Sequence, residues 1–384
     1  MAKAVYSACY QNAWDSDLQP KFLNVIFKDL IGHDCDFNSL DSISIEEFLS
    51  EVSDQSKRNE TIDLMLTVEM LCPEISQAAT ESITTWAHRL GVDHSGLALL
   101  RDLANKSIAL AQHDFYRNNY YHSLDLADPN FAKLEDKYGL PAIMLTVEQS
   151  PELLAKYDAL EFCPPASLGR LLWEFYKQRG FLFPGSIGGV NQAVAHHDWI
   201  HVLSDYDSDG IGEMEVAAFS AMTTDSPGAL MAFLGVLSIF QGGLLKSIVG
   251  TAPHLGHELE VVNGPRRIAD AIHRGKKCSI DLVTEIDFFN FANNDLNETE
   301  KMNKKFLTFI VAFLIGTGLV YAQESSVDKE IDQRFALADK NKDGKLTLAE
   351  AKEGMPRVAN NFSRIDIKNK GYVTLAEIKA MANR

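Results

Sequence analysis

Two histidines and two carboxylates in the middle of the chain have the residue types and spacing of a metal site. His197 and His201 are four residues apart, so on a helix they lie on one face, one turn from each other. Asp198 follows the first histidine, and Glu213 lies twelve residues after the second, beyond a turn at residues 209–210. Nitrogen and carboxylate ligands in this combination suit zinc, iron or manganese. The sequence therefore predicts one divalent metal ion bound by His197 and His201 together with one or both of the carboxylates Asp198 and Glu213.

The linker after the second histidine is acidic and partly imitates a calcium loop. Asp205, Asp207 and Asp209 stand at the first, third and fifth loop positions, and a glycine follows at the sixth. The imitation fails at the twelfth position, where Val216 replaces the glutamate that gives calcium two oxygens. A solvated acidic turn is the preferred interpretation, and calcium binding is the alternative.

A second histidine cluster follows in the stretch HLGHE, which contains His254, His257 and Glu258. It is neither HExxH nor the inverse of that motif, and its proline and glycine neighbours favour a loop or a helix start. Structural or surface roles are preferred for these side chains, and support of a neighbouring metal ligand remains open.

The metal motif and three flanking stretches resemble a single family. HDxxH, then eleven residues and Glu, is similar to the hallmark of the coenzyme Q (ubiquinone) biosynthesis protein 4 family. Similarity extends to residues 134–154 (LEDKYGLPAIMLTVEQSPELL), 164–175 (PPASLGRLLWEF) and 269–287 (ADAIHRGKKCSIDLVTEID). The resemblance covers about residues 129–298.

This resemblance implies an all-helical domain that acts as a zinc-dependent carboxy-lyase of ubiquinone biosynthesis. The implied reaction removes the ring carboxylate of a polyprenylated hydroxybenzoate, with His197, Asp198, His201 and Glu213 as both metal ligands and catalytic residues. The implied partners are a polyprenylated aromatic lipid, other quinone-biosynthesis enzymes and a membrane surface. The implied localisation of residues 1–300 is cytoplasmic and peripheral at the inner membrane. The alternative is a scaffold that binds lipid without catalysing.

Residues 339–350 (DKNKDGKLTLAE) match the EF-hand calcium loop at every position that its chemistry constrains. Hard oxygen ligands, a glycine at the sharp turn and a final glutamate all stand at the required spacing. The predicted calcium ligands are Asp339, Asn341, Asp343, Lys345 through its backbone carbonyl, and Glu350.

A second loop, residues 366–377 (DIKNKGYVTLAE), has the shape of an EF-hand but a weaker ligand set. Its candidate ligands are Asp366, Tyr372 through its carbonyl, and Glu377, while lysines occupy the third and fifth positions. Ammonium groups repel calcium, so weak or absent binding is expected. The loop is expected to pair with the first one, Leu346 against Val373.

Charge divides the chain into two unlike parts. The net charge is -17, but residues 1–300 hold 21 Lys and Arg against 43 Asp and Glu, whereas residues 301–384 hold 15 against 10. The acidic balance disfavours nucleic acid as a partner, because phosphate backbones are repelled. All 5 cysteines precede residue 301 without a CxxC spacing, which indicates a reducing compartment rather than a disulfide framework.

Residues 301–323 (KMNKKFLTFIVAFLIGTGLVYAQ) have the layout of a secretory signal peptide. Three lysines precede an apolar run at residues 306–322 that ends in small residues. Three interpretations stay open: a membrane anchor, a signal that starts a separate exported protein joined to the first, and a buried core helix. Under the first two, residues 324–384 are periplasmic or secreted.

The apolar pattern predicts an all-α protein in four segments. Residues 1–128 form a helical N-terminal domain that resembles the tellurite-resistance B type, and residues 129–300 form the metal and lipid domain. Residues 301–323 are the signal-like or anchor segment, and residues 324–384 the EF-hand pair. Within the second segment, the uncharged residues 226–245 predict a buried or lipid-facing helix, with a membrane span as the alternative. That helix either lines a groove for the prenyl tail or belongs to the core.

Overall fold

A computed structural model describes residues 1–11, 13–125, 131–247 and 256–295, and residues 335–378 with gaps at 336–337, 342, 356–357, 360–361, 367–369 and 376. The chain divides into two compact units, Met1–Ile310 and Val311–Arg384. The described residues are mostly α-helical, which confirms the predicted all-α class. The signal-like segment at residues 301–323 and the histidine at 254 lie outside the described residues.

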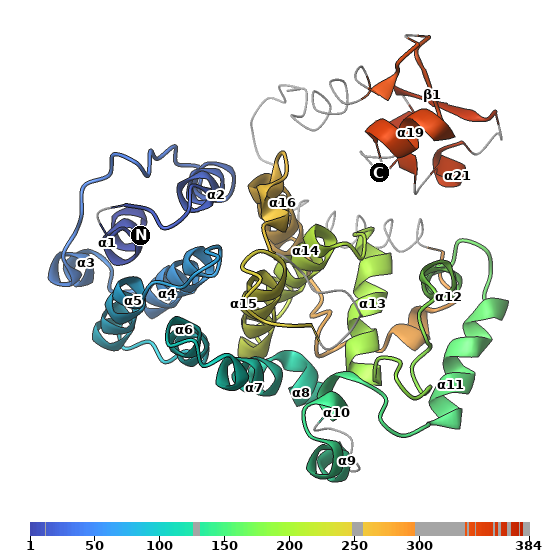
Figure 1. Ribbon diagram of the computed structural model, residues 1–384, viewed down its shortest axis with the longest axis horizontal. Helices are drawn as coiled ribbons and strands as arrows, with labels where there is room; N and C mark the ends of the chain where they lie inside the picture. The colour runs from blue at the N-terminus through green and yellow to red at the C-terminus, as the bar shows by residue number, and fades with distance from the viewer. Residues whose placement is uncertain are drawn as a thin grey trace, which may run out of the picture. The chain divides into compact units, whose positions relative to one another are not determined.

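The first unit is built from α-helices and a few single turns of 3-10 or π-helix (Figure 1). In chain order these elements are α1 (Ala2–Cys9), α2 (Leu18–Ile26), η1 (Phe27–Ile31), α3 (Ile45–Glu51), α4 (Gln55–Glu69), α5 (Gln77–Leu90), α6 (Gly96–Ala104), α7 (Ile108–Asn118), α8 (Tyr120–Asp125), α9 (Phe131–Tyr138), α10 (Pro141–Met144), α11 (Pro151–Asp158), η2 (Ala159–Phe162), α12 (Leu168–Arg179), α13 (Gln192–Ser204), α14 (Gly210–Ala221), α15 (Pro227–Phe240), η3 (Glu258–Glu260), α16 (Gly264–Lys276) and η4 (Phe288–Phe291).

One continuous hydrophobic core runs through this unit, from Ala4 in α1 to Ala292 after η4. The unit therefore spans residue 128, where the sequence pattern placed a boundary between two helical domains. Burial of apolar side chains from both sides of that position in one cluster is the main contribution to holding them together.

Local sequence signals set the ends of the three helices that carry the site. α12 begins after Ser167, whose side chain accepts a hydrogen bond from the Arg170 N–H, and ends at Gly180 in the left-handed conformation. α13 begins after Asn191, which accepts from the Val194 N–H. Asp209 caps α14 by accepting from the Gly212 N–H at 2.8 Å. Each cap satisfies an N–H that has no partner within its helix, so these three helices start where the sequence requires.

Helix α15 is a core helix of 14 residues, which confirms the prediction of a buried helix in the uncharged stretch. It packs against α14, α4, α7 and α8 (Figure 1). Phe115 of α7 fills the space beside Gly235, where a Cβ atom would collide with the phenyl ring. Among the described residues, no helix is both long and apolar enough to cross a membrane.

The second unit contains two short strands and short helices. They are β1 (Lys345–Thr347), α19 (Leu348–Gly354), α21 (Phe362–Ile365) and β2 (Tyr372–Thr374). The strands pair antiparallel with Leu346 opposite Val373, which confirms the predicted pairing. Both side chains are fully buried in a small core with Phe335, Met355 and Ile378.

Candidate metal centre

His197, His201 and Glu213 come together between α13 and α14. The two histidines lie one turn apart on α13, with ring centroids 4.4 Å from each other. Glu213 lies in the first turn of α14, and its Oε2 is 3.4 Å from His197 Nε2 while its Oε1 is 3.3 Å from His201 Nε2. Within the described part of the chain, this is the one group of three or more His, Cys, Asp and Glu whose ligand atoms all lie within 4.8 Å of one another.

These separations fit a single metal ion of zinc size. Ligand atoms about 2.0–2.2 Å from a tetrahedral ion lie about 3.4 Å apart. Each histidine Nε2 lies 3.3 or 3.4 Å from a different oxygen of Glu213, and one ligand atom from each of the three residues lies within 4.8 Å of the others. The Nε2 atom of His201 is buried and has no hydrogen bond of good geometry, although the carboxylate is near. A buried ring nitrogen without a hydrogen-bond partner is a suitable ligand for a metal ion. Three protein ligands leave a coordination position for water or substrate.

The tautomer of His201 is set by a backbone carbonyl. His201 Nδ1 lies 3.1 Å from the carbonyl oxygen of Tyr206, which can only accept a hydrogen bond. Nδ1 therefore carries the proton in the neutral ring, and the lone pair is at Nε2, toward Glu213. The side chain is 1% exposed and stacks on Phe175 at 5.8 Å between ring centroids, so its orientation is fixed by packing as well.

The electrostatic balance at His201 favours a positive charge. Burial by itself lowers the pKa of this imidazole, but the charge of Glu213 and its close contact with Nε2, followed by the charge of Asp198 and the Tyr206 carbonyl, outweigh burial, and the net pKa is raised. A metal ion supplies the same kind of charge when it binds. Glu213 is the most exposed of the three, with 22% of its side chain accessible, so the carboxylate lies on the side of the site that solvent reaches.

Two arginines from other helices hold the segment that supplies the Tyr206 carbonyl. Arg274 of α16 donates a hydrogen bond to the carbonyl of Ser204 at 2.9 Å, and its guanidinium lies over the Tyr206 ring. Arg179 of α12 donates to Ser208 Oγ at 2.6 Å. Neither arginine is recognisable as a site residue from the sequence alone. The available signal was a basic residue in the last turn of each helix, which leaves the partner unspecified.

The acidic linker serves structural contacts rather than forming a converging calcium loop. Asp205 ends α13 in the left-handed conformation, Asp207 pairs with Arg179 at 3.6 Å and Asp209 caps α14. Of the second histidine cluster, the described residues His257 and Glu258 do not belong to the triad either. His257 is exposed and its Nδ1 lies 2.7 Å from Glu260.

The predicted calcium loop is arranged around Asp339, which is 6% exposed. Its carboxylate accepts the backbone N–H groups of Asp343 at 3.2 Å and Gly344 at 2.8 Å. Asp343 Oδ2 accepts from the Asn341 amide at 3.3 Å. Glu350 accepts from Thr347 Oγ1 at 2.7 Å, and that bond, with backbone N–H groups at the loop start, lowers the pKa of the Glu350 carboxyl. The final glutamate thus folds back toward the start of its loop, although no trio of carboxylates converges in the described part of this loop.

In the second loop a lysine side chain forms an ion pair with the glutamate at the final loop position. Lys370 Nζ lies 2.5 Å from Glu377 Oε1, and this bond lowers the pKa of Glu377 to about 2. The Asp366 carboxylate accepts the N–H groups of Lys370 at 2.8 Å and Gly371 at 2.6 Å. The charge that the final glutamate of an EF-hand loop gives to calcium is neutralised here by the chain itself.

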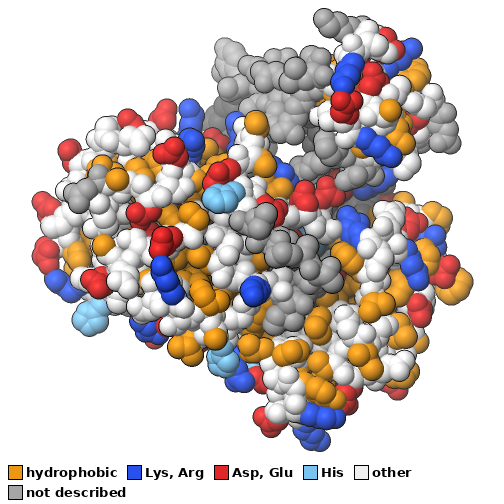
Figure 2. Space-filling model, in the orientation of Figure 1, with side chains coloured by type: hydrophobic (Ala, Val, Ile, Leu, Met, Phe, Trp, Pro, Cys, Tyr) orange, Lys and Arg blue, Asp and Glu red, His pale blue; other side chains and the backbone are white. Residues whose placement is uncertain are grey.

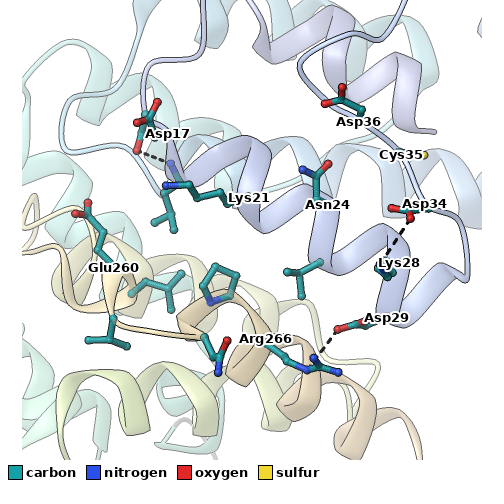
Figure 3. Close-up of a pocket in the computed structure, with 17 residues that line it drawn as sticks. Asp17, Lys21, Asn24, Lys28, Asp29, Asp34, Cys35, Asp36, Glu260 and Arg266 are labelled. Carbon is teal, nitrogen blue, oxygen red and sulfur yellow. Dashed lines mark hydrogen bonds and ion pairs between the residues drawn. The ribbon is translucent and has the colours of Figure 1, made fainter. Parts of the chain in front are cut away.

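A cleft of about 1300 Å³ lies elsewhere in the first unit, between the α2–η1 region and the start of α16 (Figure 3). Acidic and basic side chains alternate along it, with Lys28 paired to Asp34 at 3.6 Å and Arg266 to Asp29 at 3.7 Å. No residue of the His197, His201 and Glu213 group lines it. The lining contains 5 acidic and 3 basic side chains, and this mixture gives no indication of a particular ligand.

The chain has no match among protein-family models, curated proteins or solved structures. A relation to the coenzyme Q biosynthesis protein 4 family therefore stays a prediction from the motif and the three stretches of the sequence.

Proposed function

We propose that the first unit is a metal-dependent carboxy-lyase that removes the ring carboxylate of a polyprenylated hydroxybenzoate in ubiquinone biosynthesis. The observation that carries the proposal is the convergence of His197 Nε2, His201 Nε2 and the Glu213 carboxylate at separations suited to one zinc-sized ion. The Glu213 side chain is 22% exposed, which supports access of a substrate oxygen to the proposed ion.

The proposed reaction is a redox-neutral replacement of carbon dioxide by a proton. The bond between the ring carbon and the carboxyl carbon breaks, its electron pair stays on the ring carbon, and that carbon takes a proton supplied by water. A divalent ion bound by His197, His201 and Glu213 would supply Lewis acidity that stabilises the negative charge developing on the ring and its phenolate oxygen as carbon dioxide leaves. The chain contributes fixed donor atoms, because the Tyr206 carbonyl and the stacked Phe175 ring hold His201 in one orientation.

A lipid substrate is supported by apolar side chains that lead from the surface to the centre. Phe181 is 47% exposed, and its ring contacts Phe175, which in turn stacks on His201. Leu182 and Ile187 are exposed by 55% and 64% in the same loop region after α12. Figure 2 shows hydrophobic side chains among Lys and Arg over the α11 and α12 region. A surface of this kind suits a prenyl tail and a membrane interface, and we propose both as partners.

The test combines metal analysis with a decarboxylation assay on the full chain. The wild-type protein is expected to contain about one equivalent of zinc and to release labelled carbon dioxide from a carboxyl-labelled prenylated hydroxybenzoate. His201→Ala and Glu213→Gln are expected to abolish both properties, whereas His257→Ala, a surface histidine, is the matched control and should retain them. A wild-type chain that binds no divalent metal would show the proposal to be wrong.

The scaffold alternative gives a different combination of results in the same experiment. If prenylated lipid co-purifies with the wild-type chain and Glu213→Gln supports quinone synthesis in a deletion strain, the protein holds intermediates without catalysing. Co-purification of other quinone-biosynthesis enzymes would then identify the complex that it organises.

For the second unit we propose calcium binding by the single loop at residues 339–350. The pairing of Leu346 with Val373 and the return of Glu350 toward the start of its loop support this proposal. The Lys370–Glu377 contact is the reason to expect one calcium ion rather than two. Calorimetric titration of the full chain tests it, and absence of binding at millimolar calcium would contradict it.

A further inference from the structure

The buried ring of Phe175 on α12 is contacted by groups of three different kinds. The guanidinium carbon of Arg179 lies 3.9 Å from the ring centroid, His201 stacks on the ring at 5.8 Å, and Phe181 meets it edge-on at 6.0 Å. A cation, a candidate metal ligand and an exposed apolar side chain are thus gathered around one phenyl ring. The guanidinium carbon is therefore no further from the centre of the His201 ring than the first two of these distances together.

Arg179 has N–H groups that the described part of the chain does not use. Its Nε donates to Ser208 Oγ at 2.6 Å, and its Nη1 donates to the Phe175 carbonyl at 3.4 Å. Its Nη2 lies 3.6 Å from Asp207 Oδ1, which is longer than a hydrogen bond, and makes no hydrogen bond to a described residue. Because a guanidinium has five N–H groups and the side chain is 26% exposed, Arg179 can donate to a further acceptor.

The charge of Arg179 acts on the candidate metal centre. Burial lowers the pKa of the guanidinium, and the charges of Asp207, Asp198 and Glu213 oppose that effect. Arginine stays protonated at neutral pH, so it adds a permanent positive charge near the carboxylates of the centre. A planar guanidinium matches a carboxylate through two parallel hydrogen bonds, which makes a carboxylate the ligand that its unused N–H groups suit best.

We propose that Arg179 binds the ring carboxylate of the substrate and so selects hydroxybenzoates over neutral phenols. This inference rests on the proposed function and adds an orientation for the substrate. The carboxylate lies at Arg179, the hydroxyl is directed toward His201 and Glu213, and the prenyl tail extends over Phe181. A hydroxybenzoate carries its carboxylate and hydroxyl on different carbons of one ring, so it can meet the guanidinium and the metal centre together. Loss of carbon dioxide removes the group that Arg179 binds, so the product is held more weakly than the substrate.

Binding of two small probes to the full chain tests this inference. 4-Hydroxybenzoate carries the carboxylate and 4-hydroxybenzamide is its neutral counterpart, and ligand-observed NMR titration in a zinc-containing buffer measures both dissociation constants. The wild type is expected to bind 4-hydroxybenzoate about 10–100-fold more tightly than the amide. Arg179→Gln is expected to bind both probes equally. Arg179→Lys should fall between the two, because it keeps the charge and loses the planar fork.

Two control variants separate substrate binding from the structural contacts of Arg179. Lys177→Gln removes an exposed cation from the same helix that lies over Trp173 instead, and it should keep the wild-type preference. Ser208→Ala removes the hydrogen bond between Arg179 and the turn after α13, and it should keep the preference as well. A loss of preference in Ser208→Ala equal to that in Arg179→Gln would show that Arg179 acts through the turn and would overturn the inference. A wild-type chain that binds neither probe at millimolar concentration, or binds both equally, would overturn it too.

The outcomes separate this inference from the proposed function. If the chain releases carbon dioxide from its substrate and Arg179→Gln still prefers 4-hydroxybenzoate, the inference is wrong and the carboxy-lyase stands. If Arg179→Gln loses the preference in a chain that binds no metal or releases no carbon dioxide, Arg179 is a carboxylate-binding residue and the proposed function is wrong.

Discussion

Arg267 of α16 and Glu215 of α14 form a pair of parallel hydrogen bonds between the two helices. Arg267 Nε lies 2.8 Å from Glu215 Oε1, and a terminal guanidinium nitrogen lies 2.6 Å from Oε2. The Glu215 side chain is 5% exposed and that of Arg267 is 21% exposed. Since α14 also carries Glu213, this pair fastens the helix that brings the carboxylate to the candidate metal centre. The geometry is the planar two-pronged arrangement that only arginine offers a carboxylate.

Replacement of Arg267 by methionine is expected to lower the free energy of unfolding by about 3–5 kcal/mol, because it leaves a buried carboxylate without its partner. Chemical denaturation followed by circular dichroism measures the change. The double variant Arg267→Met with Glu215→Leu removes both charges and is expected to recover most of the loss. A single variant within about 1 kcal/mol of the wild type would show that the pair is of little importance to stability.

Gly212→Ala is expected to reduce metal affinity more than about tenfold without any change of a ligand. A Cβ atom at Gly212 would collide with the backbone carbonyl oxygen of Asp207, so the first turn of α14 must move and Glu213 moves with it. Metal affinity is measured by competition with a coloured chelator, together with the unfolding curve.

Gly210→Ala is the control for that variant. Its Cβ would meet the end of the Glu258 side chain, which can rotate away, rather than backbone. Alanine also favours a helix more than glycine does, so its affinity and stability should stay close to those of the wild type. Equal losses in both variants would contradict the proposed link between the start of α14 and Glu213.

The buried carboxyl of Glu69 is expected to make the first unit less stable as pH rises toward neutrality. Burial raises the pKa of this group to about 7, with Oε1 accepting the Ser76 N–H. The folded chain therefore binds more protons than the unfolded chain between pH values of about 4.5 and 7, and the free energy of unfolding falls across that window by at most about 3 kcal/mol. Denaturation curves at several pH values, compared with those of Glu69→Gln, measure this contribution.

Glu69→Gln is neutral at every pH, so the difference between its stability and that of the wild type should grow with pH in that window. Glu81→Gln on α5 replaces an exposed carboxyl and should follow the wild-type profile. Parallel profiles for the wild type and Glu69→Gln would show that Glu69 is not protonated in the folded chain.

The convergence of His197, His201 and Glu213 was predictable because it depends on local rules. Four-residue spacing places the histidines on one helix face, and the capping residue Asp209 fixes where the next helix begins. These are short-range interactions, and the sequence displays them directly. The pairing of Leu346 with Val373 was predictable for the same reason, since the loop positions of both residues are set by spacing.

The orientation of Asp198 was not predictable from the motif. It depends on the hydroxyl of Tyr176, which belongs to another helix and reaches Asp198 only after α12 packs against α13. The hydrogen bond from Arg274 to the Ser204 carbonyl at the end of α13 likewise depends on a residue that lies 70 positions later in the chain. Spacing shows which residue types share a helix face, whereas the direction of each side chain is decided by partners from distant segments.

The two EF-hand-like loops are expected to respond differently to loss of their final glutamate. Glu350→Gln removes one of the oxygens that calcium requires and should abolish binding, whereas Glu377→Gln should leave the calcium affinity of the chain unchanged. The reason for the second expectation is that Lys370, at 2.5 Å, already neutralises Glu377. Glu377→Gln should instead weaken the second loop, which is measured as a lower melting temperature of the second unit. Calorimetric titration of each full-length variant determines the number of calcium sites. Binding of a second calcium ion by the wild-type chain would show that calcium displaces Lys370 from Glu377, which would contradict this expectation.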